Sequence, residues 1–347
     1  MEGLRYIPKN ELFECSASLS GASKFFVWDG APQGLPLRAM PCLASGAGFD
    51  VSSRMGHLDF NPGYDGVPKE AIDAVLQEGV LTQIIFVRVL PSPQKSRLRL
   101  SCAAPGKFSA VLCFHTTGRQ RFSSENFVEV SLAPGAELDL TVMQNENLIS
   151  RHRSDFRLSV EEGSCLKMNI ITLRGGNTSN RIHCLLAAKN AECVLNGLYL
   201  ADGQQVIDTD ITLLHNAPEC KSRQLFKGVL AGNARSKFTG EVVVAPCAQK
   251  TEAYQANNNL LTSDTARASS DPHLVIYADD VKCSHGSTCG SIGDQELFYM
   301  RSRGISEHEA RILQQQAFAG AVLEQVSNPD LRERLTSLVE HRLRAQK

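Results

Sequence analysis

The chain has 347 residues, enough to bury a large core in one big domain or in two to three ordinary ones. Its 36 lysines and arginines against 37 aspartates and glutamates leave none of the excess positive charge that phosphate-backbone binding needs, so nucleic acid is not an expected partner. The first twenty residues lack the apolar run of a secretory signal, and the most apolar stretch, VLTQIIFVRVL, is interrupted by Gln83 and Arg88. We therefore expect a cytoplasmic protein that does not insert into a membrane.

Residues 1–80 are expected to form an irregular N-terminal segment with one short helix. Much of this segment is rich in glycine, proline, serine and alanine and offers only short extended candidates such as Phe25 to Trp28. The helix is predicted over VPKEAIDAVLQEG, residues 67–79, because Pro68 suits a first helical turn and Gly79 suits a C-terminal stop.

Residues 81–292 carry short runs of alternating apolar residues, which are typical of β-strands. Three such runs are Val128, Val130 and Leu132; Leu138, Leu140 and Val142; and Leu166, Met168 and Ile170. Turn signals recur at Gly135, Gly163, Asn190 and Ala217, at steps of 28, 27 and 27 residues. This near-constant interval predicts a β-solenoid, in which each coil covers the apolar face of the next. An antiparallel sandwich is the alternative, although sandwich turns recur more closely, about every 8 to 12 residues. His215, in ITLLHNAP, is predicted to lie in a turn.

Residues 293–347 are predicted to be helical. In ISEHEARILQQQAFAGAVLEQV, Ser306 and Glu309 form a capping box, and one face is predicted to carry Ala310, Leu313, Ala317 and Ala321. A last helix follows Asn328 and Pro329, with an apolar stripe of Leu331, Leu335, Leu338 and Val339. These stripes must pack on the end of the solenoid, on each other or on another protein.

The segment ADDVKCSHGSTCG, residues 278–290, concentrates the side chains that could carry chemistry. In a strand, Cys283 and His285 would lie on one face, where a thiolate and an imidazole could bind a metal or a soft cluster. Cys289 would join them if the strand ran straight through Gly286, Ser287 and Thr288. A closed zinc site is disfavoured, because it needs four ligands in paired short spacings.

Two other interpretations of this segment stay open. A Cys–His nucleophile would need the base within hydrogen-bond reach of the sulfur, with Asp279 or Asp280 orienting the imidazole. Alternatively, Cys283 and Cys289 are buried structural thiols and His285 is a hydrogen-bonded structural histidine.

The stretch TEAYQANNNLLTSDTARASSDPHLVIYADDVKCSHGSTCGSIGDQELFYMRSRGISEHEAR closely resembles the C-terminal signature of the SufB/SufD family of iron-sulfur cluster assembly proteins. The upstream stretch that begins GLYLADGQQVIDTDITLLHNAPECK continues the match, so that together they cover roughly residues 195–315. The run KCSHGST followed by LFYMRSRGI is similar to the SufD branch, since the SufB branch usually has a glutamate where this chain has Gly286.

The resemblance implies a mainly β protein, with a right-handed parallel β-helix (β-solenoid) core over residues 81–292. A small C-terminal α-helical region over residues 293–347 would dock the SufC ATPase, and a SufB subunit would join through the end of the β-helix. The candidate docking residues for SufC are Phe298, Tyr299, Arg303, Gly304 and Phe318. Family members commonly carry a longer helical N-terminal region than the one expected here.

The family's interface histidine falls at His285 and its neighbouring cysteine at Cys283. A transient iron-sulfur cluster would form there, at the interface shared with SufB, and the isolated chain would hold no cofactor. Some family complexes also bind a reduced flavin. The sequence has no P-loop of the form GxxxxGK[ST], so ATP hydrolysis is expected in SufC, and this chain would be a non-catalytic scaffold.

Two other functions remain alternatives to the SufD-like scaffold. One is a SufB-like homodimer that carries the cluster without a partner, and the isolated chain could also form a homodimer. The other is a β-helix enzyme acting on carbohydrates, which would call for export and for a cluster of carboxylates along one face.

Overall fold

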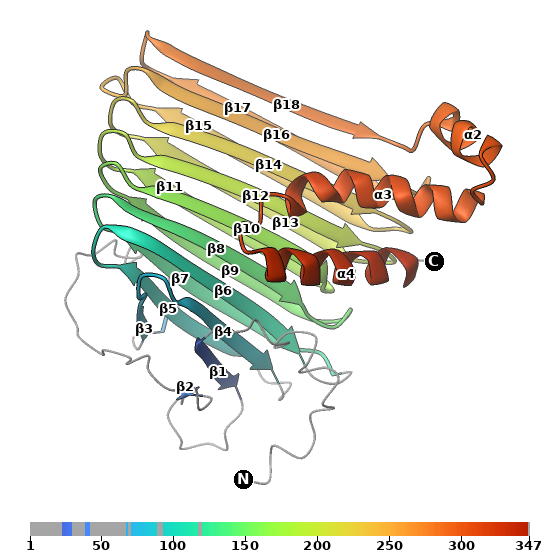
Figure 1. The fold of residues 1–347 in the computed structure, drawn as a ribbon, viewed down its shortest axis with the longest axis horizontal. Helices are drawn as coiled ribbons and strands as arrows, with labels where there is room; N and C mark the ends of the chain where they lie inside the picture. The colour runs from blue at the N-terminus through green and yellow to red at the C-terminus, as the bar shows by residue number, and fades with distance from the viewer. Residues whose placement is uncertain are drawn as a thin grey trace.

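The computed structural model describes residues 23–29, 39–41, 67–68, 71–88, 93–116 and 120–345. Within them, the chain winds into a mainly β parallel β-helix that carries helices on one side (Figure 1). Each coil contributes one strand to each of two sheets, so strands that are two apart in sequence are neighbours in space. All pairs within the two sheets are parallel except that of β1 with β2, which excludes the antiparallel sandwich.

The first sheet runs in the order β18-β16-β14-β12-β10-β8-β6-β4-β1-β2. Its strands, in chain order, are β1 Ser23–Asp29, β2 Ala39–Pro41, β4 Leu81–Arg88, β6 Gly106–Thr116, β8 Ala136–Asn145, β10 Cys165–Arg174, β12 Glu192–Ala201, β14 Lys221–Leu230, β16 Thr251–Leu261 and β18 Val281–Gly290. The second sheet consists of β3 Ile72–Val75, β5 Gln94–Cys102, β7 Ser123–Leu132, β9 Arg151–Val160, β11 Asn177–Leu186, β13 Val206–His215, β15 Arg235–Val244 and β17 Arg267–Ile276. The helices are α2 Asp294–Ser302, α3 Glu307–Leu323 and α4 Pro329–Ala345.

The core lies between the two sheets and is built from alternate residues of each strand. Leu138, Leu140 and Val142 of β8 lie in register beside Leu166, Met168 and Ile170 of β10, and all six side chains are buried. Burying a side chain of this size contributes about 1.5–3 kcal/mol, so stacked rows of this kind supply the main stabilisation. The predicted solenoid is thereby confirmed.

The corners of successive coils share one backbone conformation. Gly135, Gly163 and Asn190 have φ values of 74°, 61° and 59°, in the left-handed region that glycine and asparagine adopt at least cost. The fourth corner of this column lies at Glu219, with φ 60°, two residues beyond the predicted Ala217. Backbone hydrogen bonds join the corners, for example from Gly135 N to Glu162 O at 2.9 Å.

The helix predicted over residues 67–79 is wrong, because Ile72–Val75 forms β3 and pairs with β5. The spacing of Ile72, Val75 and Leu76 suits a helix, but Ala74 and Leu76 also alternate, and both enter the core beside β5. The extended candidate from Phe25 to Trp28 lies within β1, which pairs with β4. The region limits at residues 80 and 292 stay a prediction, although β1, β2 and β3 precede residue 81 and belong to the two sheets.

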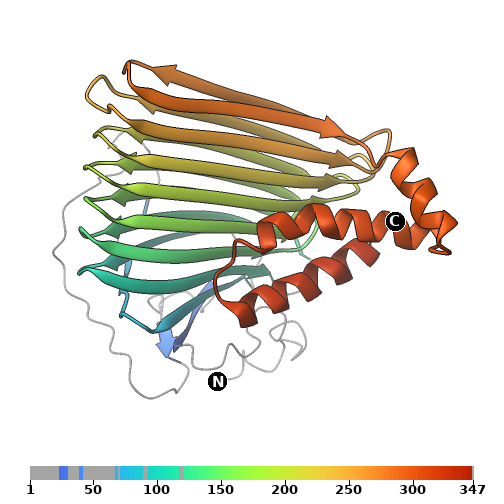
Figure 2. The same ribbon diagram turned by 45° about the horizontal axis from the view of Figure 1, so that its top comes forward.

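The helices α3 and α4 lie along the outer face of the first sheet (Figures 1 and 2). Their apolar residues pack with side chains of β10, β12 and β14, so the stripes cover the side of the solenoid rather than its end. Ser306 caps α3 by accepting a hydrogen bond from Glu309 N at 3.2 Å, which confirms one half of the predicted capping box, whereas the Glu309 carboxylate pairs with Arg344. Among the described residues, no helix is both long and apolar enough to cross a membrane.

The predicted face of α3 is wrong at Leu313 and Ala317 but correct at Ala310, whereas the predicted stripe of α4 is confirmed. In α3, Leu313 and Ala317 are exposed, and the buried positions are Ala310, Ile312, Gln315, Ala319, Val322 and Leu323. The reason is that α3 packs on both the sheet and α4, so its buried surface is wider than one stripe and rotated from the predicted one.

Candidate functional site

The last coil ends both sheets. β18 is the end strand of the first sheet and β17 that of the second, so within the part of the chain that the structure describes each has an edge with no strand beyond it (Figure 1). Such an edge presents unpaired backbone N–H and C=O groups, which pair readily with another chain. The two edges lie at the same end of the β-helix.

β18 brings Cys283, His285 and Cys289 onto one face. The strand is continuous from Val281 to Gly290, so it runs straight through Gly286, Ser287 and Thr288. In register, the three residues lie beside Ala253, Gln255 and Asn259 of β16, which are buried in the interior of the solenoid. Neighbours in register share a face, so the three side chains belong to the inward row of the last coil. They are half-buried or exposed, since no further coil in the described part of the chain covers them.

The spacing of this row limits what one chain can bind. Strand residues rise about 3.3 Å each, which puts Cα atoms of Cys283 and His285 roughly 7 Å apart and those of His285 and Cys289 about 13 Å apart. Within the described residues, no group of three or more His, Cys, Asp or Glu side chains is placed to hold a metal ion. Among the described residues, the row therefore offers two donors at most to any one ion.

The nucleophile interpretation finds no support in the geometry. Burial raises the pKa of the Cys283 thiol, partly offset by a backbone hydrogen bond at Ala253. Among the described residues, no hydrogen bond links Cys283 to His285 or His285 to either aspartate before the strand. A thiol that stays protonated beside an unoriented imidazole is a weak nucleophile.

Polar side chains of the preceding coils lie next to this row, in the interior of the solenoid. Gln255 Nε2 donates to Gln224 Oε1 at 3.0 Å. Farther along the strands, Tyr199 donates its hydroxyl to Asn259 Oδ1 at 2.6 Å and accepts from Asn257 Nδ2 at 3.2 Å. All five side chains are buried, and burial raises the pKa of Tyr199. The interior of the last coils is thus polar where it meets the open end.

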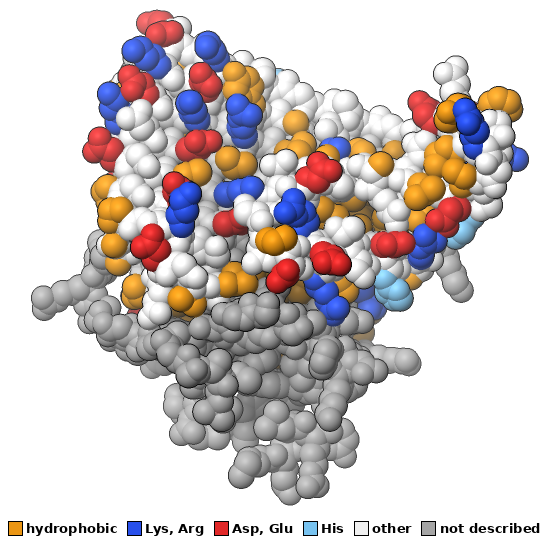
Figure 3. Space-filling view, viewed as in Figure 1, with side chains coloured by type: hydrophobic (Ala, Val, Ile, Leu, Met, Phe, Trp, Pro, Cys, Tyr) orange, Lys and Arg blue, Asp and Glu red, His pale blue; other side chains and the backbone are white. Residues whose placement is uncertain are grey.

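Four of the five predicted docking residues come together at α2 and the turn after it. Phe298 and Tyr299 are 75% and 60% exposed, and Arg303 lies over the Tyr299 ring at 5.3 Å with a hydrogen bond from Nη2 to Tyr299 Oη at 3.2 Å. Gly304 follows with φ 86°. Figure 3 shows apolar side chains gathered over this end of the molecule.

Phe318, the fifth predicted docking residue, lies apart from the others. It is on α3 and is partly buried against the sheet, where Lys227 Nζ sits 4.4 Å from its ring centroid. Lys227 Nζ also donates to the carbonyl oxygen of Phe318 at 3.1 Å. Phe318 therefore holds α3 in place and does not share the exposed surface at α2.

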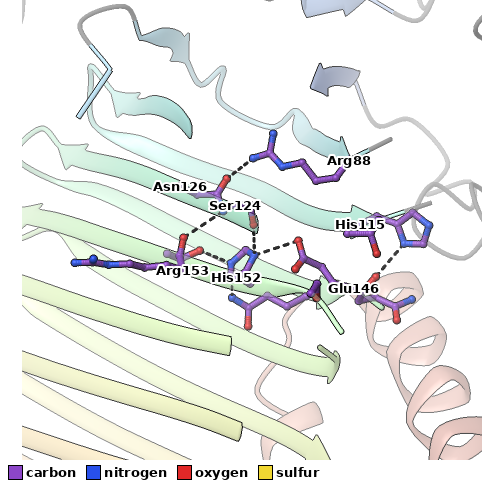
Figure 4. Close-up of polar contacts among 12 residues, drawn as sticks. Arg88, His115, Ser124, Asn126, Glu146, His152 and Arg153 are labelled. Atoms are coloured by element: carbon purple, nitrogen blue, oxygen red, sulfur yellow. Dashed lines mark hydrogen bonds and ion pairs between the residues drawn. The ribbon is translucent and has the colours of Figure 1, made fainter. Parts of the chain in front are cut away.

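A buried polar cluster in the early coils was not anticipated from the sequence. Figure 4 shows His152 between Ser124 and Glu146, with Arg88 reaching Asn126. His152 Nδ1 lies 3.2 Å from Glu146 Oε1 and Nε2 lies 2.6 Å from the hydroxyl of Ser154. Burial works to raise the pKa of Glu146, but His152 and Arg88 hold it below its ordinary value.

The order carboxylate, imidazole and hydroxyl resembles that of serine hydrolases, but Ser154 is 0% exposed and no substrate reaches it. The cluster therefore has a structural role. The signal that could have revealed it is a run of polar residues at inward strand positions, as at Ser124 and Asn126 or His152 and Ser154.

Comparison with known proteins agrees with this architecture. The family model for the SUF system FeS cluster assembly, SufBD core domain, matches residues 93–318. The iron-sulfur cluster assembly protein SufD of Escherichia coli (strain K12) is 34% identical over 224 residues, which is 65% of this chain and 53% of that protein. Protein ABCI7, chloroplastic, of Arabidopsis thaliana is 28% identical over 214 residues, 61% of this chain and 45% of that protein.

A SufBD family protein of Mycobacterium tuberculosis is 33% identical over 200 residues, which is 55% of this chain and 50% of that protein. The chain spans about half the length of the curated relatives it matches. The matched region runs from the first complete coils to α3, and so includes both open edges and the row on β18. This chain belongs to the SufBD family of the SUF system for iron-sulfur cluster assembly.

Proposed function

We propose that the chain is a SufD-like scaffold subunit, which pairs with SufB to form the site of the nascent cluster and does not itself hydrolyse ATP. The observation that carries the proposal is the open end of the β-helix, where the inward row of Cys283 and His285 lies on an edge strand that no other described strand adjoins on its outer side. A SufB-like subunit that added strands to β17 and β18 would extend both sheets across the boundary.

Such pairing would also complete the coordination of the cluster. Among the described residues no group of three or more possible ligands is placed to hold an ion, and the added subunit would supply ligands beside those of β18. A neutral imidazole binds iron and is released more readily than a thiolate, which suits a site that must give up its cluster. His285 is therefore the proposed ligand, and Cys283, with its raised pKa, is a secondary candidate.

The helices would couple this end to the ATPase. The exposed surface of Phe298, Tyr299 and Arg303 is the proposed contact for SufC, in which ATP hydrolysis would occur. Because α3 and α4 are packed on the first sheet, a force applied to them would pass into the β-helix. A cytoplasmic location and a reduced flavin in the complex stay predictions from the sequence.

Coexpression with SufB and SufC tests the proposal. We expect the wild-type chain to form one stable complex with SufB and SufC. The double variant Phe298→Ser, Tyr299→Ser should still copurify with SufB but should no longer bind SufC. Glu324→Gln, at the exposed residue directly after α3, serves as its control. Failure to copurify with SufB would contradict the proposal, and a homodimer that holds iron and sulfide without SufB would favour the SufB-like carrier instead.

A further inference from the structure

Gln255 on β16 lies directly beside His285 on β18. The two residues are paired in register and belong to the same inward row, but Gln255 is 3% exposed whereas His285 is exposed at the open end. Neighbouring strands are about 4.8 Å apart, so the side-chain amide lies within reach of the imidazole. Gln255 is thus the residue of β16 that is paired with His285.

The two ends of the Gln255 amide have different surroundings. Its Nε2 donates to Gln224 Oε1 at 3.0 Å, on the side of the preceding coil. A Cβ atom at Gly240, on the opposite sheet, would collide with Nε2, so the glycine makes room for the amide in this orientation. Its Oε1 is fully buried and accepts no hydrogen bond from the described residues. A buried oxygen left without a donor costs about 1–3 kcal/mol, so this atom calls for a donor.

His285 has the complementary requirement. Neither ring nitrogen is hydrogen-bonded to another described residue. A histidine that binds a metal needs the lone pair of one nitrogen, and an acceptor for the N–H of the other fixes the tautomer and the ring orientation. Gln255 Oε1 is an acceptor in the right row to do this.

We propose that Gln255 is a positioning residue for His285. The ring turns inward so that one N–H donates to Gln255 Oε1, which leaves the other nitrogen, with its lone pair, facing the edge where a partner binds. The role of His285 as a ligand rests on the proposed function, but the contact with Gln255 does not. Loss of such an outer contact typically lowers metal affinity or activity about 10–100-fold.

The tautomer of His285 is the first test. In the full chain labelled with ¹⁵N at the histidine rings, the signal of His285 is assigned by its loss in His285→Ala, at a pH where the ring is neutral. We expect a single tautomer in the wild type, a mixture like that of a free imidazole in Gln255→Met, and a single tautomer again in Gln255→Glu, which keeps the acceptor. In Gln255→Glu, the Gln224 amide can rotate so that its Nε2 donates to the new carboxylate. In the wild type this Nε2 has no acceptor among the described residues.

Ser284→Ala, on the outward face of the same strand, is the control and should resemble the wild type. A mixture of tautomers in the wild type would overturn the proposal, whether or not the variants fold.

Cluster formation in the complex with SufB and SufC is the second test. We expect Gln255→Met to slow it about 10–100-fold and Gln255→Glu to restore it. If His285→Ala forms clusters at the wild-type rate while the wild type shows one tautomer, the proposed function of His285 fails and the contact stands. If His285→Ala is impaired but Gln255→Met keeps both the wild-type tautomer and rate, the positioning role is refuted.

Discussion

Arg342 of α4 and Asp202, at the corner after β12, form a bidentate ion pair across 140 positions of sequence. Arg342 Nη2 lies 2.8 Å from Asp202 Oδ1 and Nη1 lies 3.1 Å from Oδ2. Arg342 Nε also donates to the carbonyl oxygen of Leu173, at the end of β10, at 3.0 Å. One partly buried side chain therefore ties the last helix to two coils of the solenoid.

Replacing Arg342 with lysine should loosen α4 without unfolding the β-helix. Lysine cannot reproduce the planar fork, and the loss of charge-assisted hydrogen bonds costs about 1.5–3 kcal/mol. Hydrogen exchange should speed up in α4 and stay unchanged in β8 and β10. The control is Arg344→Lys, whose pairs with Glu309 and Glu340 are more exposed, so this change should leave the protection of α4 nearly unchanged. Equal protection of α4 in both variants would show that Arg342 does not anchor the helix.

Replacing His285 with alanine should leave folding and assembly intact but impair cluster formation by the complex. The side chain is exposed on the end strand, so its removal costs little stability. Anaerobic reconstitution, followed by iron and sulfide analysis, should show that cluster formation falls at least about tenfold. Removing only a residue that hydrogen-bonds a metal ligand already has an effect of this size. Ser284→Ala on the opposite face should be neutral. A wild-type rate for His285→Ala would remove this residue from the site.

Gly228 of β14 should not tolerate alanine. It pairs in register with Tyr199 of β12, and a Cβ atom there would collide with the tyrosine ring and approach Asn259 Oδ1 to 2.7 Å. Overpacking of this kind costs about 1–3 kcal/mol, measured as a lower midpoint of urea unfolding. Removing the ring with Tyr199→Ala should make the two changes non-additive.

Gly286→Ala is the matched control, since no atom of the described residues lies within 4 Å of a Cβ atom at that position of β18. An unfolding midpoint unchanged in Gly228→Ala would mean that the coils have room to separate at this point.

His215 should make stability depend on pH in the mildly acidic range. It is the last residue of β13, is 0% exposed and makes a hydrogen bond with Ser222 through Nε2 at 2.8 Å. Burial lowers the pKa of His215 from 6.5 to about 4. Between these values the unfolded chain binds the proton and the folded chain does not, so the free energy of unfolding falls as pH falls.

The contribution of His215 to the free energy of unfolding is fully present above pH 6.5. It is lost progressively as the pH falls toward 4, by about 3 kcal/mol in all. Urea unfolding at a series of pH values should therefore show a shallower dependence in His215→Gln than in the wild type. His308→Gln, at an exposed position of α3, is the control. Identical pH dependences for His215→Gln and the wild type would contradict the lowered pKa.

The architecture was predictable from the sequence because every coil of a solenoid repeats the same short pattern of strands and turns. Alternation in runs such as Leu138, Leu140 and Val142 indicates which side chains face inward, and turn signals at steps of 27 or 28 residues approximate the length of a coil, whose observed corners are 27 to 29 residues apart. The same alternation placed Cys283 and His285 on one face, since side chains of a strand repeat every two residues. The N-cap at Ser306 likewise depends on neighbours only three residues apart.

The failures have a common cause in contacts between residues far apart in sequence. The apolar residues of the segment Ile72–Val75 have a spacing that suits either a helix or a strand. The segment forms a strand because it pairs with the backbone of β5. The buried face of α3 depended on where α4 and the sheet lay, and His215, predicted in a turn, completes a strand because β11 and β15 flank it.

The sequence by itself determined the coil length, the inward rows and the presence of a thiol and an imidazole on one strand face. Only the tertiary structure decided that this strand ends its sheet, that Gln255 lies beside His285, and that His152 meets Glu146 inside the core. Periodicity along a chain specifies which way a side chain points, because that depends on local backbone geometry. Which residue it meets depends on the register between coils, and the register is set by the packing of all of them together.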